Sequence, residues 1–180
     1  GVCLMPLATY PLIAWGSADD LSAYTTGSGT PTVTGSVADP FGGTGAYTID
    51  DNDAGGVENK YKAVTFPANG THQLAIFAKA GTATTSHVAV FDNTATAFRA
   101  VLALAWSGGV PTATIASGSG TVHGTISVGS SWYLILWAAD NIVAANTNRL
   151  YFYGATTTAG TTGTTTYYVR NVVALDYMDE

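Results

Sequence analysis

The chain has 180 residues, of which 47% are hydrophobic and only 10% are charged, and its formal net charge is −6. This length suits one domain with a real core, and the hydrophobic content excludes a disordered or polyelectrolyte chain. The six basic residues are scattered, so the composition also argues against nucleic acid as a partner, because phosphate backbones need clustered Lys and Arg.

The opening segment of the chain, residues 1–14, is apolar. It has no basic region at its start, and Pro6 and Pro11 interrupt it, which argues against both a signal peptide and a membrane span. We expect either an extended arm that reaches a neighbouring subunit or an edge strand tucked along a domain formed by residues 15–180.

Runs of β-branched and aromatic residues then recur between clusters of Gly, Asn, Asp and Pro, which is the pattern of short strands and turns. They predict an all-β, antiparallel β-sandwich of about a dozen strands. The segments Ala138–Asn146 and Thr156–Thr166 are predicted as loops. The expected strands are Leu12–Trp15, Thr32–Ser36, Ala46–Ile49, Tyr61–Phe66, Gln73–Ala80, His87–Phe91, Arg99–Trp106, Thr112–Ala116, Val122–Val128, Trp132–Ala138, Leu150–Tyr153 and Tyr167–Leu175.

Several short motifs stand in a recognisable order along these strands. Pro40–Ala46 reads PFGGTGA before a strand, Ser131–Tyr133 opens a later strand with SWY, and Tyr151–Ala155 reads YFYGA. From about Trp15 to Leu175, the chain resembles the jelly-roll modules of tailed-phage virion proteins, which are similar in shape to carbohydrate-binding modules and concanavalin-like lectins. The resemblance implies that the sandwich is a jelly roll.

The resemblance also implies a non-enzymatic function on the surface of a virus particle assembled in the host cytoplasm. The protein would be a capsid decoration protein or a head or tail fibre component, and its partners would be other virion proteins and further copies of itself, with a trimer favoured. A surface poor in charge and rich in Thr and Gly fits such packing. The alternative is a carbohydrate-binding module or adhesin that recognises glycans through exposed aromatic residues.

Enzyme hypotheses find little support in the residues. A glycosidase normally needs two carboxylates across the scissile bond, whereas the chain has only two Glu, one of which is its last residue, Glu180. No Gly-x-Ser-x-Gly elbow occurs. The histidines His72, His87 and His123 lack the spacing of a zinc site. We therefore expect no catalytic residues and no required cofactor.

One acidic segment has the composition of a cation site. Asp50, Asp51, Asp53 and Glu58 supply four carboxylates within nine residues, next to a pair of glycines. Calcium prefers such oxygen-rich loops, so a structural calcium ion is one hypothesis. The other is a hairpin between the strands Ala46–Ile49 and Tyr61–Phe66, whose turn needs Asp, Asn and Gly for positive φ angles alone.

Aromatic residues provide the remaining candidate site. Side chains alternate between the two faces of a strand, so Tyr151 and Tyr153 share one face of their strand, while Tyr168 and Arg170 share one face of the last expected strand. If these two strands are neighbours, the four residues form an outward patch that binds a glycan or docks a partner subunit. The alternative is that both faces of the sandwich are covered.

Overall fold

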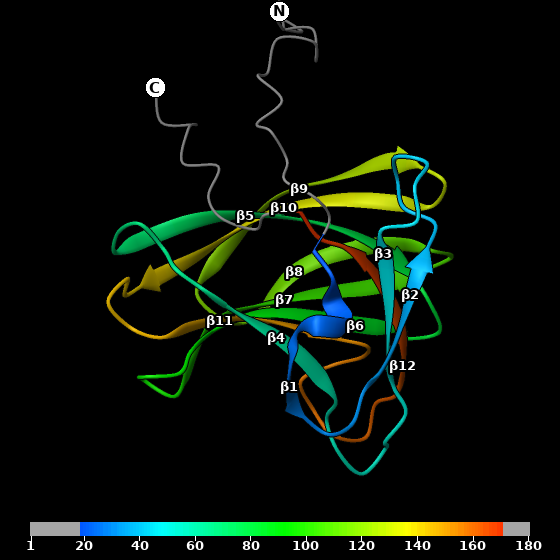
Figure 1. Ribbon diagram of the computed structural model, residues 1–180. Coiled ribbons are helices and arrows are strands. Elements are labelled where there is room, and N and C mark those ends of the chain that lie inside the picture. Colours follow the sequence, from blue (N-terminus) through cyan, green and yellow to red (C-terminus); the bar gives the residue numbers. More distant parts are fainter. Residues whose placement is uncertain (1–18, 171–180) are drawn as a thin grey trace, which may run out of the picture.

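The computed structural model describes residues 19–170 (Figure 1). The expected arm of residues 1–14, the expected strand Leu12–Trp15 and the end of the expected strand Tyr167–Leu175 lie outside these described residues.

Two antiparallel six-stranded sheets, twelve strands in all, make up the described part of the chain and form an all-β sandwich. The described residues hold no α-helix, only the short 3-10 helix η2 (Leu21–Ala23), and thus no helix long and apolar enough to cross a membrane. Sheet one has the order β1 (Thr25–Ser28), β4 (Asn59–Val64), β11 (Asn148–Tyr153), β6 (Thr85–Asp92), β7 (Ala97–Ser107) and β8 (Val110–Gly118). Sheet two has the order β2 (Thr32–Val37), β3 (Ala46–Asp51), β12 (Gly163–Tyr168), β5 (Gly70–Ala80), β10 (Trp132–Ile142) and β9 (Gly120–Gly129).

The main core lies between the two sheets. Alternate residues of each strand point inward, so Leu102 and Phe152 of sheet one meet Ile135, Trp137 and Tyr167 of sheet two, all essentially inaccessible to solvent. Burying an apolar side chain of this size contributes about 1.5–3 kcal/mol to folding. The burial of these alternating apolar side chains is therefore the main source of the stability of the fold.

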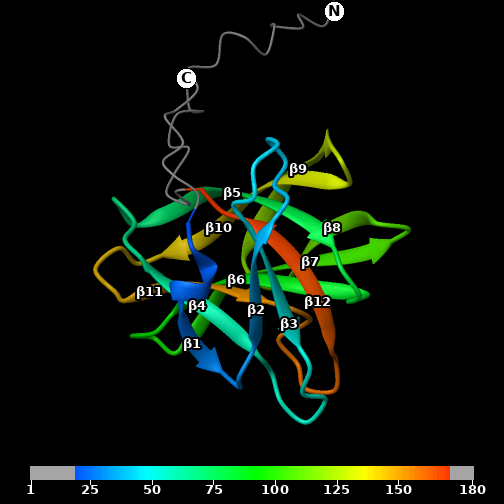
Figure 2. The ribbon, with the colours of Figure 1, turned by 45° about the vertical axis from the view of Figure 1, so that its right-hand side comes forward.

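The two last strands lie in the middle of their sheets (Figure 2). β11 pairs with β4 and β6 in sheet one, and β12 pairs with β3 and β5 in sheet two. The buried Tyr167 hydroxyl crosses the interior and donates to the backbone oxygen of Tyr153 at 2.8 Å, while the Thr165 hydroxyl donates to the backbone oxygen of Gly154 at 2.9 Å. These bonds tie the sheets together where β11 ends.

Most expected strands are confirmed, with longer bounds, and three details are wrong. The predicted loop Ala138–Asn146 begins as strand, because β10 continues to Ile142, a buried core residue. The Thr-rich segment Thr156–Thr166 ends as strand, since β12 starts at Gly163 and its β-branched threonines pair with β3 and β5. The exposed strand β1 has no apolar alternation, and the sequence did not predict it.

Gly154 tests how closely the two sheets approach each other. A Cβ atom there would lie 2.6 Å from the Asp51 nitrogen and 2.7 Å from the Gly163 oxygen, which are rigid backbone atoms. We expect Gly154→Ala to lower the free energy of unfolding by about 1–3 kcal/mol through overpacking. Chemical denaturation measures the change.

Gly124→Ala is the matched control, because nothing lies within 4 Å of a Cβ atom at Gly124 in β9. This variant should keep or slightly raise the stability, since alanine costs less backbone entropy than glycine in a strand. Equal stabilities of the two variants would show that the sheets do not meet at Gly154.

Candidate functional site

The four residues of the expected patch lie on two different sheets. Tyr151 and Tyr153 belong to β11 in sheet one, whereas Tyr168 ends β12 in sheet two and Arg170 follows it. The condition that the two strands are neighbours is not met, because they lie in different sheets and each inserts between earlier strands of its own sheet. The structure therefore places the four residues in two separate pairs, one on each sheet, and they do not form one patch.

The first pair, Tyr168 and Arg170, lies on the outer side of sheet two. Tyr168 points away from the main core, as its alternation with Tyr167 predicts, but it is buried beside Phe77 and Trp132. The exposed Phe41 covers it, with ring centroids 5.6 Å apart, and the Arg170 guanidinium lies 5.3 Å from the centre of the Phe41 ring. Tyr168 is therefore not free to stack on a ligand.

The loop that carries Phe41 is held by one carboxylate. Asp39 accepts hydrogen bonds from the backbone nitrogens of Phe41 at 2.8 Å, Gly43 at 3.0 Å and Gly45 at 3.1 Å. Its pKa is lowered because these donors, with Arg170 nearby, outweigh the opposing effect of desolvation. The PFGGTGA motif thus forms an anchored turn that keeps Phe41 61% exposed.

The second pair belongs to a larger cluster on the outer side of sheet one. Tyr151 lies directly across from Tyr61 of β4, with ring centroids 5.0 Å apart, and 5.8 Å from Phe91 of β6. Phe91 in turn contacts Phe98 of β7 at 5.0 Å. We call Tyr61, Phe91, Phe98, Arg149 and Tyr151 the aromatic surface.

Arg149 is the polar member of the aromatic surface. Its guanidinium carbon lies 4.3 Å from the centre of the Tyr61 ring, and Nη1 donates to the Tyr151 hydroxyl at 3.3 Å. These two contacts hold the guanidinium against the rings of two strands. The aromatic surface thus combines ring faces with a positioned cation.

Tyr153 shares the outward face of β11 with Tyr151, but it is buried and so is not part of the aromatic surface. Only 3% exposed, it packs with Ala89 and Val101 and is stacked 6.1 Å from Tyr151. Burial raises the pKa of its hydroxyl, so Tyr153 stays neutral under ordinary conditions. Its ring packs against that of Tyr151 along the strand.

Sequence reasoning found Tyr151 but missed its neighbours Tyr61, Phe91, Phe98 and Arg149. Each of them occurs in a predicted strand or beside one, so their presence on strands was available from the sequence. Their meeting depends on the strand order β4, β11, β6 and β7, which the sequence alone does not encode in any local motif.

The acidic segment between β3 and β4 acts mainly as a set of backbone acceptors. Glu58 is buried, and its two oxygens accept from the backbone nitrogens of Thr30 at 2.9 Å and Asn52 at 2.7 Å. Asp53 accepts from the nitrogen of Gly55 at 2.8 Å in an exposed turn. The hairpin hypothesis for this segment is wrong, because β3 lies in sheet two and β4 in sheet one, and neither Gly55 nor Gly56 has a positive φ. The bonds instead hold a connection between the two sheets.

Asp51 is the exception in the acidic segment. It is 1% exposed, its Oδ2 accepts from the Glu58 nitrogen at 3.3 Å, and its Oδ1 has no partner. Burial raises its pKa, and the nearby Glu58 and Asp53 add to the effect. Calcium needs six to eight oxygens, whereas no three acidic, His or Cys side chains within residues 19–170 converge on one point. The calcium hypothesis, with Asp50, Asp51, Asp53 and Glu58, stays a prediction.

Comparison with known proteins adds no family to this picture. No protein-family model matches the chain, and no curated protein matches it in sequence. The function therefore has to be argued from the two outer faces of the sandwich.

Asp51 gives a test of the calcium hypothesis with a pH dependence. A raised pKa in the folded state means that ionised Asp51 destabilises the fold at neutral pH, and that this penalty disappears as the pH falls through the folded pKa. Without calcium, Asp51→Asn should therefore raise the melting temperature at pH 7, and the gain should vanish near pH 4 and below.

Thermal unfolding in millimolar calcium and in chelator completes this test. A calcium site at Asp51 would make calcium raise the melting temperature of the wild type but not of Asp51→Asn. Asp20→Asn is the control, since it removes a carboxylate outside the acidic segment and an Asn side chain keeps the exposed cap bond to Ser22. Identical wild-type melting in calcium and in chelator would overturn the calcium hypothesis.

Proposed function

We propose that the protein is a non-enzymatic structural component of a bacteriophage virion with a jelly-roll sandwich, either a capsid decoration protein or a head or tail fibre component. It would act at the surface of the particle, after assembly in the host cytoplasm, by associating with other virion proteins and with further copies of itself, a trimer being favoured. The observation that carries this proposal is the apolar outer face of sheet two.

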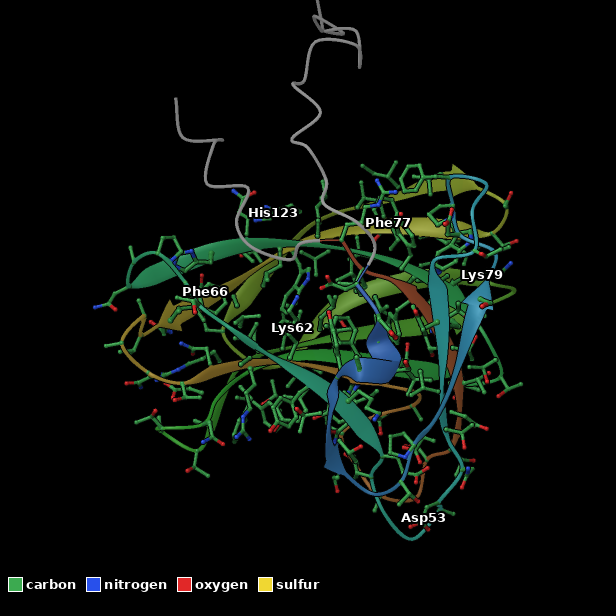
Figure 3. All side chains as sticks on the ribbon, viewed as in Figure 1. Asp53, Lys62, Phe66, Phe77, Lys79 and His123 are labelled. Carbon is green, nitrogen blue, oxygen red and sulfur yellow. The ribbon has the colours of Figure 1, made fainter. Side chains whose placement is uncertain are left out.

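Apolar side chains cross this outer face of sheet two. Ile126 of β9 is 48% exposed and lies directly across from Leu134 of β10, which in turn pairs with Phe77 of β5. Phe41, in the loop before β3, adds a third apolar side chain, and its ring lies 5.3 Å from that of Phe77, which is labelled in Figure 3. We call Phe41, Ile126 and Leu134 the sheet-two surface.

The chemistry of the sheet-two surface suits association between subunits. Its exposed members are hydrophobic, and removing them from water is favourable by about 25 cal/mol per Å² of apolar area. Its charged neighbours are Asp39 in the Phe41 loop and Arg170, 5.3 Å from the centre of the Phe41 ring. Because apolar area rather than these charges is proposed to drive the association, the binding should depend weakly on salt. The absence of catalysis is part of the same proposal, since the buried carboxylates Glu58 and Asp92 bind backbone or side-chain donors of the fold.

The proposal predicts the size of the protein in solution. Light scattering on a sizing column should give a trimer or larger assembly whose mass is the same at low and high salt. Ile126→Asp places a charge in the sheet-two surface and should shift the assembly towards monomer.

Val110→Asp is the matched control, because Val110 is 52% exposed but belongs to β8 of sheet one. It should leave the mass unchanged. A wild-type monomer, or an assembly that dissociates in modest salt, would contradict the proposal.

A second candidate function is favoured by the aromatic surface of sheet one. Tyr rings offer an apolar face to a sugar ring and a hydroxyl at the edge, and Tyr61 and Tyr151 are both partly exposed. We propose, as this second candidate, that the protein is a carbohydrate-binding module or adhesin that holds a glycan against these rings.

Truncating Tyr151 tests this candidate. Tyr151→Ala should weaken glycan binding about tenfold or more, because a central aromatic residue carries much of the energy of a binding surface. The fold should persist, since the buried Tyr153 and Phe152 remain in place. A glycan array followed by calorimetry measures the loss, with Phe41→Ala on sheet two as the control. Unchanged affinity in Tyr151→Ala would rule out the aromatic surface as the glycan site.

A further inference from the structure

We infer that the aromatic surface selects acidic saccharides, with the carboxylate of a uronic-acid-type sugar on Arg149 and the sugar ring on Tyr151 and its neighbours. This inference rests on the second candidate function, glycan binding, and names the class of glycan. It follows from the position of Arg149 and from the charges around it.

Among the described residues Arg149 has no acidic partner, whereas Lys62 and Arg99 of the same sheet each have one. Lys62 is paired with Asp19 at 2.7 Å, and Arg99 is paired with the buried Asp92. Lys60 donates to the Thr26 hydroxyl at 3.0 Å and to the Tyr24 backbone oxygen at 3.2 Å. Within residues 19–170, no carboxylate lies within 4 Å of the Arg149 guanidinium.

The contacts of Arg149 hold the guanidinium in place but leave most of its hydrogen-bond donors unused. A guanidinium has five N–H donors, and one of them is used, in the long bond to the Tyr151 hydroxyl at 3.3 Å. The stacking on Tyr61 is made through the face of the group, which leaves the in-plane donors at its edge. Such a preoriented edge matches the two oxygens of a carboxylate, which arginine binds through paired hydrogen bonds.

The rings beside Arg149 define where the rest of the ligand would lie. Tyr151 is in contact with Tyr61 on one side and with Phe91 on the other, and Phe98, 38% exposed, extends the row onto β7. A cation at one end of an aromatic row fits a ligand with an apolar ring face and a carboxylate, which is the chemistry of a uronic acid. A neutral sugar would leave the Arg149 donors to water.

The surrounding charge strengthens this assignment. The whole chain has a net charge of −6, so an anionic ligand is repelled by most of the molecule. An unpaired guanidinium held against aromatic rings creates a local exception on such a protein. The specificity should therefore be electrostatic and should weaken as salt increases, unlike association through the sheet-two surface.

The test compares acidic sugars with their own neutral esters. The full chain is titrated by calorimetry with trisaccharides of galacturonic, glucuronic and mannuronic acid, and with the methyl ester of each. The wild type should bind at least one of the acids about tenfold or more tightly than its ester, and the difference should shrink in high salt. Arg149→Gln should bind the acid and the ester equally, and Arg149→Lys should retain part of the preference.

Lys79→Gln is the matched control, because it removes the same charge from sheet two and should leave the preference intact. Equal binding of acids and esters by the wild type overturns the acidic specificity and leaves glycan binding standing. Binding of neither overturns the inference, and the glycan array then decides the second candidate function separately. Circular dichroism of Arg149→Gln confirms that a lost preference does not come from a lost fold.

Discussion

The hydroxyl of Tyr167 links the two sheets of the sandwich. This link positions the two strands, β11 and β12, whose outward residues belong to the two outer faces. Tyr167 belongs to sheet two, yet its hydroxyl donates to the backbone of Tyr153 in sheet one at 2.8 Å. Full burial makes this bond costly to lose, since an unpaired hydroxyl in the core is unfavourable by about 1–3 kcal/mol. The bond sets β11 against β12, and β11 carries the central residues of the aromatic surface.

The sequence predicted the type of fold far better than the candidate site. Alternation of apolar residues is a local property, so it located eleven of the twelve described strands and put Tyr167 inside and Tyr168 outside. The aromatic surface depends on pairing between strands distant in sequence, as between Tyr61 and Tyr151. No local pattern specifies such pairing, so the sequence left open whether β11 and β12 are neighbours, and the structure places them in different sheets.

The two outer faces differ in the kind of interaction that each offers. The sheet-two surface presents the exposed hydrophobic side chains Phe41 and Ile126, a chemistry that suits contact with another protein. The aromatic surface mixes rings with Arg149, a chemistry that suits a small polar ligand with an apolar face. Because the core separates the faces, the proposed assembly and the proposed glycan binding do not compete for the same residues.

The central positions of β11 and β12 have a consequence for the order of folding. During synthesis, β4 and β6 emerge from the ribosome long before β11, and β3 and β5 long before β12. Each of these strands therefore has an unpaired edge until residues 148–168 have been synthesised. Unpaired strand edges promote aggregation. Folding is thus expected to be late and slow, and a chain that ends before Asn148 would leave neither sheet able to close.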